Sequence, residues 1–354
     1  MKRRSFLKTA GTIAGGYALA LDKVLAAEGA GVRTGEEKVN GMPRRVLGRT
    51  GRKISIVGFP GLSLVHYDQE QCTKGLHDAF ERGVNYFDVA PAYGNGEAEI
   101  KMGIGLQGID RSKIFLSCKT KIRDKAGARE ELERSLKRLK TDYFDLYQLH
   151  HLWNADQVKQ ALGPGGAMLT LLKARDEGKI KYLGFSAHTR KAALDALKGF
   201  PFDTVMFPVN FVEDFKIGFS RPVLNSAKKR GAAVIAIKPL SMGAWPKDAE
   251  RRRKWWYKTT ESQQEVDLAM RYTLALDGVV TGIPPSFLDL LDKAIIAAKS
   301  YKRITNGEVA KLKRKAESCL SVFEKEEQRE ARGDLKAGPA YADSPHECCC
   351  EHCA

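Results

Sequence analysis

Short apolar runs alternate with longer amphipathic segments along most of the chain from about residue 43. Apolar runs of this length are typical of buried parallel strands, which are covered on both faces and so lack a polar side. Eight such runs predict strands at Ile54–Phe59, Asn85–Ala90, Ile114–Thr120, Asp145–His150, Tyr182–Ser186, Thr204–Val209, Ala233–Lys238 and Val279–Ile283.

The segments between these runs have the spacing of surface helices. Glu130–Leu139 places its leucines on one stripe and its charges elsewhere, and Ser262–Leu276 is patterned in the same way. Strands alternating with helices predict a closed parallel barrel or a doubly wound open sheet, and the count of eight favours the (β/α)8 TIM barrel of the α/β class. No Gly-x-Gly-x-x-Gly motif follows a strand, which argues against a Rossmann dinucleotide fold.

Four parts are expected along the chain. The barrel spans residues 42–300 and begins with a small hairpin within Met42–Lys53 that caps its floor. Residues 301–332 form a C-terminal region in which Gly307–Arg332 reads as one helix lying on the barrel. Residues 333–354 form an extended Cys-rich tail, and residues 1–27 form a signal peptide.

The N-terminal residues have the layout of an export signal. The segment KRRSFLK at residues 2–8 precedes a mild apolar stretch, Thr9–Leu21, and Ala26 and Ala27 offer a cleavage site. This pattern resembles a twin-arginine signal, although Lys2 stands where Ser or Thr is usual. We expect export to the periplasm or the cell exterior, with the twin-arginine machinery as a partner. The alternative is a basic arm followed by a short helix.

The chain is strongly basic, with a formal net charge of +16. Residues 1–27 contribute +4 of this, which leaves about +12 on the remainder. A basic surface attracts phosphates and acidic molecules, but no nucleic-acid motif accompanies it and no nucleic-acid partner is predicted. No apolar run of membrane-spanning length follows the N-terminal segment.

Four of the seven cysteines lie in the last seven residues, at Cys348, Cys349, Cys350 and Cys353. This is not the pattern of a disulfide-stapled secreted domain. The spacing also departs from bacterial iron–sulfur motifs and from the separated pairs that zinc prefers. No metal ligand is therefore assigned, and an untidy or disulfide-paired tail and a metal or thiol redox site both stay open.

Polar residues that can carry chemistry lie at or just after the ends of three predicted strands. These are Asp88, Tyr93, Lys119 and His150. In a barrel of this kind the carboxyl ends of the strands meet at one mouth, where active sites are built. The sequence therefore predicts that the four side chains converge.

Five segments carry a resemblance to the aldo-keto reductase family: RVLGRTGRKIS, NYFDVAPAYGNGEAEI, IFLSCKT, ELERSLKRLKTDYFDLYQLH and GKIKYLGFS. The match covers about Met42 to Ser300. It implies a reductase that moves a hydride between NADP or NAD and a small-molecule carbonyl or alcohol. It also implies that Asp88, Tyr93, Lys119 and His150 are the catalytic tetrad.

The chemistry of carbonyl reduction requires groups of these types. A hydride goes to carbon and a proton goes to oxygen, and Tyr93 can supply the proton. A tyrosine has a pKa of about 10, and we expect the Lys119 cation to lower it. Asp88 would orient Lys119, and His150 would aim the substrate oxygen.

The resemblance also implies a cofactor site. Its residues are Ser186, Asn210, Lys238, Pro239, Leu240, Pro284 and Ser286. Ala187 and Met206 stand where the family usually has amide side chains, and Ile237 stands where an aromatic ring is common. The segment Phe287–Leu291 offers no basic residue for a 2′-phosphate, and Lys293 is the first candidate, so NADP and NAD both stay open.

Two other interpretations remain beside an enzyme. The altered amide positions favour an exported regulatory or redox-sensing barrel that binds cofactor with little turnover. The Cys-rich tail favours a metal or thiol electron-transfer role. Tryptophans 153, 245, 255 and 256 either line a substrate pocket or pack a loop. The substrate and the oligomeric state are not predicted.

Overall fold

The computed structural model describes residues 37–332. The expected signal peptide at residues 1–27 and the Cys-rich tail at residues 333–354 lie outside the described residues. None of the helices within 37–332 combines the length and the apolar character needed to cross a lipid bilayer.

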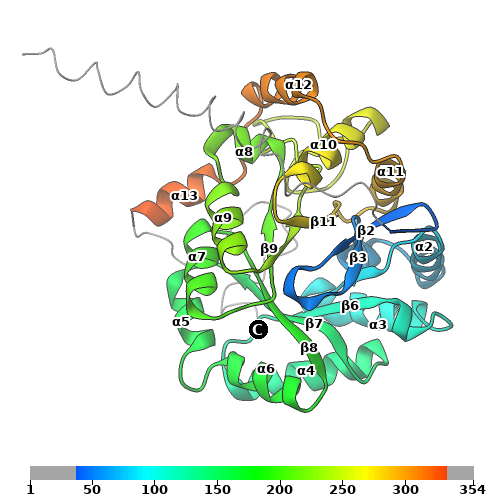
Figure 1. Cartoon of the computed structure of the whole chain (residues 1–354), viewed down its shortest axis with the longest axis vertical. Coiled ribbons are helices and arrows are strands. Elements are labelled where there is room, and N and C mark those ends of the chain that lie inside the picture. The colour runs from blue at the N-terminus through cyan, green and yellow to red at the C-terminus, as the bar shows by residue number, and fades with distance from the viewer. Residues whose placement is uncertain (1–36, 333–354) are drawn as a thin grey trace, which may run out of the picture. The chain divides into compact units, whose positions relative to one another are not determined.

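Eight parallel strands form the barrel, each hydrogen-bonded to the next in chain order (Figure 1). They are β4 (Phe59–Pro60), β5 (Tyr86–Asp88), β6 (Phe115–Thr120), β7 (Phe144–Leu152), β8 (Ile180–Ala187), β9 (Thr204–Pro208), β10 (Ala233–Ile237) and β11 (Val279–Ile283). The sheet closes where Gly58 N donates to Gly282 O at 3.1 Å and Gly282 N donates to Ile56 O at 3.0 Å. The predicted (β/α)8 barrel is confirmed.

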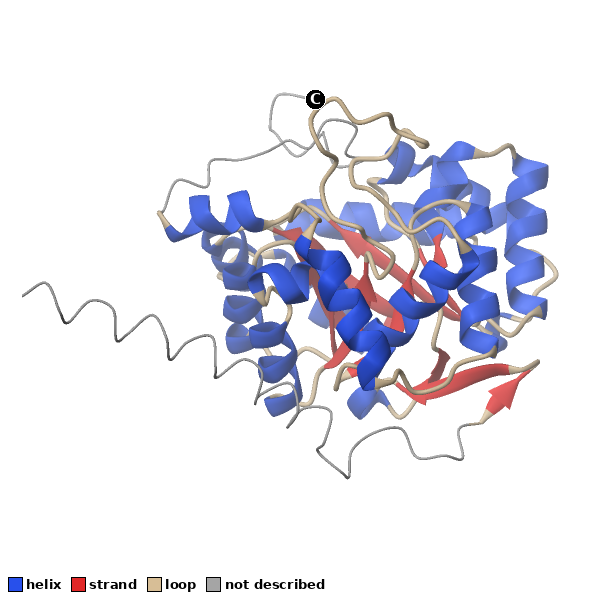
Figure 2. Ribbon diagram, turned by 90° about the horizontal axis from the view of Figure 1, so that it is seen from above, coloured by secondary structure: helices blue, strands red, loops and turns tan. Residues whose placement is uncertain are grey.

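Helices flank the strands on the outside of the barrel (Figure 2). They are α2 (Gln69–Glu81), α3 (Glu97–Gly105), α4 (Lys125–Leu139), α5 (Ala155–Leu162), α6 (Ala167–Asp176), α7 (Arg190–Gly199), α8 (Phe211–Ile217), α9 (Arg221–Lys229), α10 (Gln263–Ala275) and α11 (Leu288–Lys299). Helix α4 contains the predicted leucine stripe and buries it, and Asp124 caps its N-terminus by accepting from Gly127 N. Helix α10 matches the second predicted segment, with Ser262 as its cap.

A three-stranded antiparallel sheet precedes the barrel. It consists of β1 (Lys38–Val39), β2 (Met42–Val46) and β3 (Lys53–Ser55). Leu47 and Ile54 are fully buried in one apolar cluster with Tyr86 and Phe115 from the barrel strands. The predicted hairpin is confirmed, and its apolar side chains join the barrel core.

The first predicted strand, Ile54–Phe59, is wrong as one element. It divides into the end of β3 and the start of β4. Ser55 causes the division, because its N–H donates to Asn85 Oδ1 and its hydroxyl donates to Val57 O. These bonds turn the chain from the hairpin into the barrel, which an apolar run alone does not reveal.

The single helix expected at Gly307–Arg332 is also wrong. The chain forms α12 (Asn306–Glu317) and α13 (Glu324–Ala331), joined by a segment at 318–323. Glu213, from α8, accepts hydrogen bonds from Ser321 Oγ at 2.5 Å and from Val322 N at 2.7 Å. Because Val322 N donates to a side chain of another helix, it does not make the backbone hydrogen bond that would continue α12.

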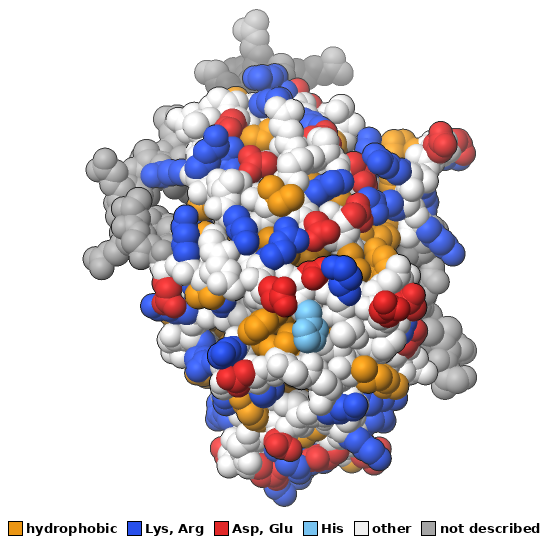
Figure 3. Space-filling model, turned by 90° about the vertical axis from the view of Figure 1, so that its right-hand side faces the viewer, with side chains coloured by type: hydrophobic (Ala, Val, Ile, Leu, Met, Phe, Trp, Pro, Cys, Tyr) orange, Lys and Arg blue, Asp and Glu red, His pale blue; other side chains and the backbone are white. Residues whose placement is uncertain are grey.

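Charges of both signs are distributed over the face shown in Figure 3. Lys and Arg side chains alternate there with Asp and Glu. Ion pairs with partly exposed side chains occur on the protein surface, such as Arg82 with Asp292 and Lys228 with Asp277. The face in Figure 3 is therefore mixed in charge and shows no large patch of one sign.

Candidate active site

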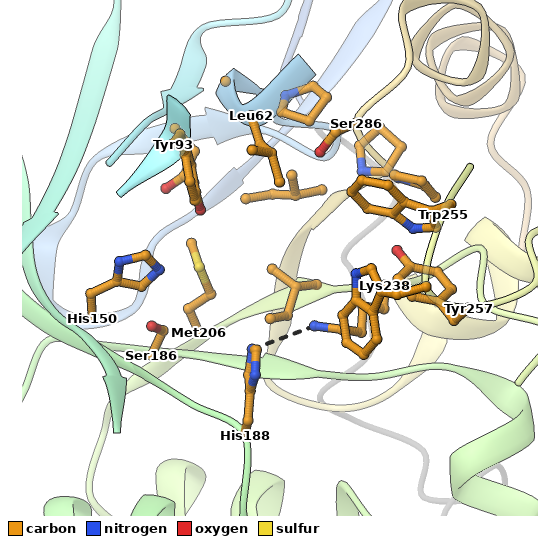
Figure 4. A pocket seen from close by; sticks show the side chains of 18 residues that line it. Leu62, Tyr93, His150, Ser186, His188, Met206, Lys238, Trp255, Tyr257 and Ser286 are labelled. Atoms are coloured by element: carbon orange, nitrogen blue, oxygen red, sulfur yellow. Dashed lines mark hydrogen bonds between the residues drawn. The ribbon is translucent and has the colours of Figure 1, made fainter. Parts of the chain in front are cut away.

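A pocket of about 590 Å³, part of it open to solvent, lies where the barrel strands end (Figure 4). Its wall comes from the ends of the strands and from the loop after β10. The lining residues are Pro60, Gly61, Leu62, Asp88, Tyr93, His150, Ser186, His188, Met206, Ile237, Lys238, Trp255, Trp256, Tyr257, Ile283, Pro284, Pro285 and Ser286.

Lys119 is the centre of a buried polar group behind this pocket. It lies on β6, whose residues are all buried, and its side chain is 0% exposed. Its Nζ donates to Asp88 Oδ2 at 2.5 Å, to Val89 O at 3.0 Å and to Tyr93 Oη at 3.2 Å. The three acceptors match the three hydrogens of an ammonium group, so the cation is fully satisfied.

Tyr93 is placed by a tight turn after β5. Its N–H donates to Ala90 O, and the next three residues, Gly94, Asn95 and Gly96, all have positive φ before α3 begins. The ring meets the imidazole of His150 edge-on, with 5.7 Å between ring centroids. The structure thus brings all four predicted catalytic side chains to the same mouth of the barrel.

Gly61 brings another part of the chain close to this group. A Cβ at this position would lie 2.1 Å from the backbone oxygen of Asp88. Such a contact is impossible without moving the backbone, so only glycine allows the segment after β4 to lie against Asp88.

The electrostatics differ from the expectation for Tyr93. Burial raises the pKa of its phenol, and Lys119 lowers it by less, so the net pKa lies above the usual 10. Burial likewise raises the pKa of Asp88 more than Lys119 lowers it. For Lys119 burial acts to lower the pKa, but the attraction of Asp88 and Tyr93 outweighs it, and the pKa is raised. The phenol therefore stays protonated and the ammonium stays charged at neutral pH.

His150 lies on β7, just before a local irregularity in that strand. The next residue, His151, has a φ of +57°, and its N–H donates to Ser186 Oγ at 2.7 Å. Arg123 donates to the carbonyl oxygens of both histidines. Burial lowers the pKa of His151 well below 6.5, so this ring is neutral.

The expected cofactor residues divide into two groups. Ser186, Lys238, Pro284 and Ser286 line the pocket, whereas Asn210, Pro239 and Leu240 do not. Asn210 caps α8 by accepting from Glu213 N. Pro239 packs near Gly282, and Leu240 is fully buried and accepts from Thr260 N. These three support the frame of the site rather than its surface.

The loop after β10 contributes Trp255 and Trp256, for which the sequence left a pocket wall and loop packing both open. Two further lining residues, Tyr257 from the same loop and His188 after β8, were not predicted. The sequence signal was the aromatic run WWY at residues 255–257, which could equally have packed a loop. Of the other tryptophans, Trp153 stacks on His151 with 5.3 Å between centroids, and Trp245 donates to Trp255 O, both away from the pocket lining.

The basic residues near the start of α11 are already engaged. Lys293, the predicted 2′-phosphate candidate, donates to Glu261 O at 2.7 Å. Arg253, which the sequence did not single out, pairs with both Glu261 and Asp289. Arg253 would therefore have to give up a carboxylate to take a new anion, whereas Lys293 keeps ammonium donors that its bond to Glu261 O does not use.

Comparisons with known proteins support the reductase interpretation. The model of the Aldo/keto reductase family matches residues 58–312. The chain is 29% identical over 218 residues to L-galactose dehydrogenase of Arabidopsis thaliana, covering 56% of this chain and 66% of that protein. It is 33% identical over 158 residues to an uncharacterized oxidoreductase of Bacillus subtilis (strain 168), covering 41% and 49%. The matches thus span less than two-thirds of these relatives.

Solved structures show the same fold. An aldo-keto reductase from Bacillus halodurans in its holo form aligns with a TM-score of 0.64 at 24% identity, covering 81% of this chain and 99% of that one. One from Klebsiella pneumoniae in complex with NADPH aligns with a TM-score of 0.59 at 20% identity, covering 76% and 93%.

Proposed function

This chain belongs to the aldo/keto reductase family, and we propose that it transfers a hydride between a nicotinamide cofactor and the carbonyl or alcohol group of a small molecule. One observation carries the proposal. Lys119 bonds both Asp88 Oδ2 and Tyr93 Oη at the pocket where His150 also lies. A phenol bonded to a buried ammonium is a proton donor whose anion is stabilised in advance.

The side chains that line the pocket suit a nicotinamide dinucleotide in their chemistry. Apolar side chains of Met206, Ile237 and Ile283 suit a planar ring, and the hydroxyls of Ser186 and Ser286 suit a ribose or an amide. We infer that the two serines and Pro284 contact the cofactor, NADP or NAD, which supplies or accepts the hydride when bound.

The side chains of this protein handle the proton. In the reducing direction the Tyr93 hydroxyl gives its proton to the carbonyl oxygen while a hydride reaches the carbonyl carbon. The phenolate left behind accepts a hydrogen bond from Lys119 Nζ, and Asp88 holds that ammonium in place. His150 donates a hydrogen bond to the same substrate oxygen and fixes its direction. Oxidation of an alcohol reverses these steps.

The raised pKa of Tyr93 favours the reducing direction. A phenol that stays protonated at neutral pH can act as an acid at once, whereas a base must first lose its proton. The reductase activity is therefore expected to be broad through neutral pH, and alcohol oxidation is expected to rise toward alkaline pH.

The test compares wild type with Tyr93→Phe on a panel of aldehydes with NADH and NADPH. Tyr301→Phe is the matched control, since Tyr301 packs against Arg45 away from the pocket. We expect Tyr93→Phe alone to lose turnover while cofactor affinity is kept. Full activity in Tyr93→Phe contradicts the proposal. Cofactor binding without turnover in wild type supports the regulatory alternative.

We also propose that the protein is exported by the twin-arginine route, on the strength of Arg3 and Arg4 followed by Phe6 and Leu7. Replacing both arginines by lysine and fractionating the cells tests this directly. Retention of the variant inside the cell supports export by this route, and unchanged distribution contradicts it.

A further inference from the structure

Lys238 is a buried cation in the pocket wall with no carboxylate of the described residues in direct contact, although the more distant Glu213 favours its charge. It follows β10, is 6% exposed and lines the pocket. No carboxylate among residues 37–332 lies within 4.0 Å of its Nζ. Its one polar neighbour is His188 Nε2 at 3.4 Å. An ammonium has three donors, so at least two remain for another molecule.

The backbone conformation of Lys238 is energetically unfavourable, and its aromatic neighbours offset only part of the cost of burying its ammonium group. Lys238 has a φ of +60°, which is unfavourable for any residue but glycine. The ring of Trp256 lies 4.9 Å from Nζ, and that of Phe323 lies 5.8 Å away. Phe323 is itself stacked flat on Phe219, with 4.6 Å between centroids. Aromatic faces stabilise a cation only partly, and an unpaired buried charge stays costly.

We propose that Lys238 and His188 form an anion-binding subsite that takes the acidic group of the substrate, a carboxylate or a phosphate. The two residues reach the pocket from the ends of β10 and β8. Figure 4 shows them facing each other, with Tyr93 and His150 at one side and Trp255 and Tyr257 at the other. One ligand can therefore present its carbonyl to Tyr93 and its acidic group to Lys238. The substrate class is a carbonyl compound that carries a negative charge.

Two further observations agree with an acidic ligand. A charge-assisted hydrogen bond from the ammonium to a carboxylate offsets the desolvation that Lys238 suffers in the folded protein. Residues 28–354 also carry a net charge of about +12, which raises the local concentration of anions around the protein. Burial lowers the pKa of Lys238 to about 7, so the subsite is charged and strongest below that pH.

The first experiment measures binding without turnover. Succinate is titrated into the wild type and Lys238→Met at pH 6, and tryptophan fluorescence is followed because Trp256 lies beside Nζ. Lys229→Met is the control, since this lysine is exposed at the end of α9 and is not part of the pocket lining. We expect a loss of affinity of about 10- to 100-fold in Lys238→Met alone. Equal affinity in all three proteins overturns the proposal.

The second experiment identifies which molecule carries the anion, and it rests on the proposed function. It compares 4-oxobutanoate with butanal, which differ only in the acidic group, and measures the Kd of NADH and NADPH in parallel. We expect Lys238→Met to lower kcat/KM for 4-oxobutanoate by about 10- to 100-fold more than it lowers kcat/KM for butanal, and to change the Kd of NADH and NADPH by less than that factor. An equal loss for both aldehydes with weaker cofactor binding places the anion on the cofactor and overturns the proposal.

His188→Gln provides a second variant in case Lys238→Met perturbs the pocket. Gln keeps a polar partner for the lysine, so we expect a smaller loss of succinate affinity and of kcat/KM for 4-oxobutanoate than in Lys238→Met. No loss of either quantity in either variant counts against the subsite. If the wild type reduces no aldehyde at all, the proposed function fails, but the succinate titration still decides whether the anion site exists.

Discussion

Replacing Lys238 by methionine is predicted to make the ligand-free protein more stable. Methionine fills similar space, has no charge to desolvate and tolerates apolar surroundings. Lysine at this position has a pKa of about 7 in the folded chain against 10.5 in an exposed one, and burial is the main cause. The folded state thus binds a proton less readily than the unfolded state does.

The sign and size follow from that difference of about 3.5. Above pH 10.5 the side chain is neutral in both states and has no effect. As the pH falls from 10.5 to 7 only the unfolded chain gains the proton, and folding loses about 1.4 kcal/mol per pH unit. The free energy of unfolding is lowered by about 4 kcal/mol at pH 7, and the effect levels off near 5 kcal/mol below that pH. Methionine at this position removes this destabilisation.

Other titrating groups near Lys238 set the useful pH range. His151 is neutral throughout because its pKa lies well below 6.5. Glu213, whose charge favours the ammonium, has a pKa of about 6, so its influence is constant above about pH 7. His188 faces the ammonium directly. The window from pH 7 to 10 therefore isolates Lys238.

Urea unfolding of wild type, Lys238→Met and Lys229→Met at several pH values in this window is the assay. Buffers without phosphate or carboxylate are needed, since an anion in the subsite would stabilise the wild type. The expected result is an advantage for Lys238→Met that shrinks as the pH rises, with Lys229→Met close to wild type. A variant that is less stable, or an advantage independent of pH, refutes the reasoning.

Three other changes test separate parts of the structure. Lys119→Met leaves Asp88 buried without its partner and is expected to cost about 3–5 kcal/mol of unfolding free energy in urea, together with the activity. Gly61→Ala places a Cβ against the Asp88 carbonyl oxygen, so kcat is expected to fall, and a variant with unchanged kcat contradicts the close approach. Burial raises the pKa of Glu213 to about 6 from 4.5, so its contribution to stability is full below pH 4.5 and is lost as the pH rises through 6, a change of about 2 kcal/mol. Glu213→Gln keeps an acceptor for Val322 N, and thermal unfolding across that range should show a flatter pH dependence than wild type.

Much of the fold could be predicted from local pattern. Buried parallel strands are apolar throughout, so the runs at Val279–Ile283 and Ala233–Lys238 appear in the sequence and in the barrel with nearly the same bounds. The break between α12 and α13 could not be predicted, because Glu213, about a hundred residues earlier, holds the backbone at Val322.

The site divides in the same way. Asp88, Lys119 and His150 could be placed because a parallel barrel carries its strand ends to one mouth. The direction of the Tyr93 pKa could not, since it depends on how deeply the phenol is buried and not only on a nearby cation. The partnership of Lys238 with His188 was likewise hidden, because the two residues are fifty positions apart and meet only across the closed sheet.

The central claim is that Tyr93 gives the proton while a hydride reaches the substrate in this pocket. The most direct measurement follows deuterium from a nicotinamide cofactor dideuterated at carbon 4 into the alcohol product, by mass spectrometry, in wild type and Tyr93→Phe. A singly deuterated alcohol is expected from wild type, with a rate at least about 100-fold lower in the variant and equal cofactor Kd in the two proteins. No transfer of label by wild type, or equal rates in the two proteins, would contradict it.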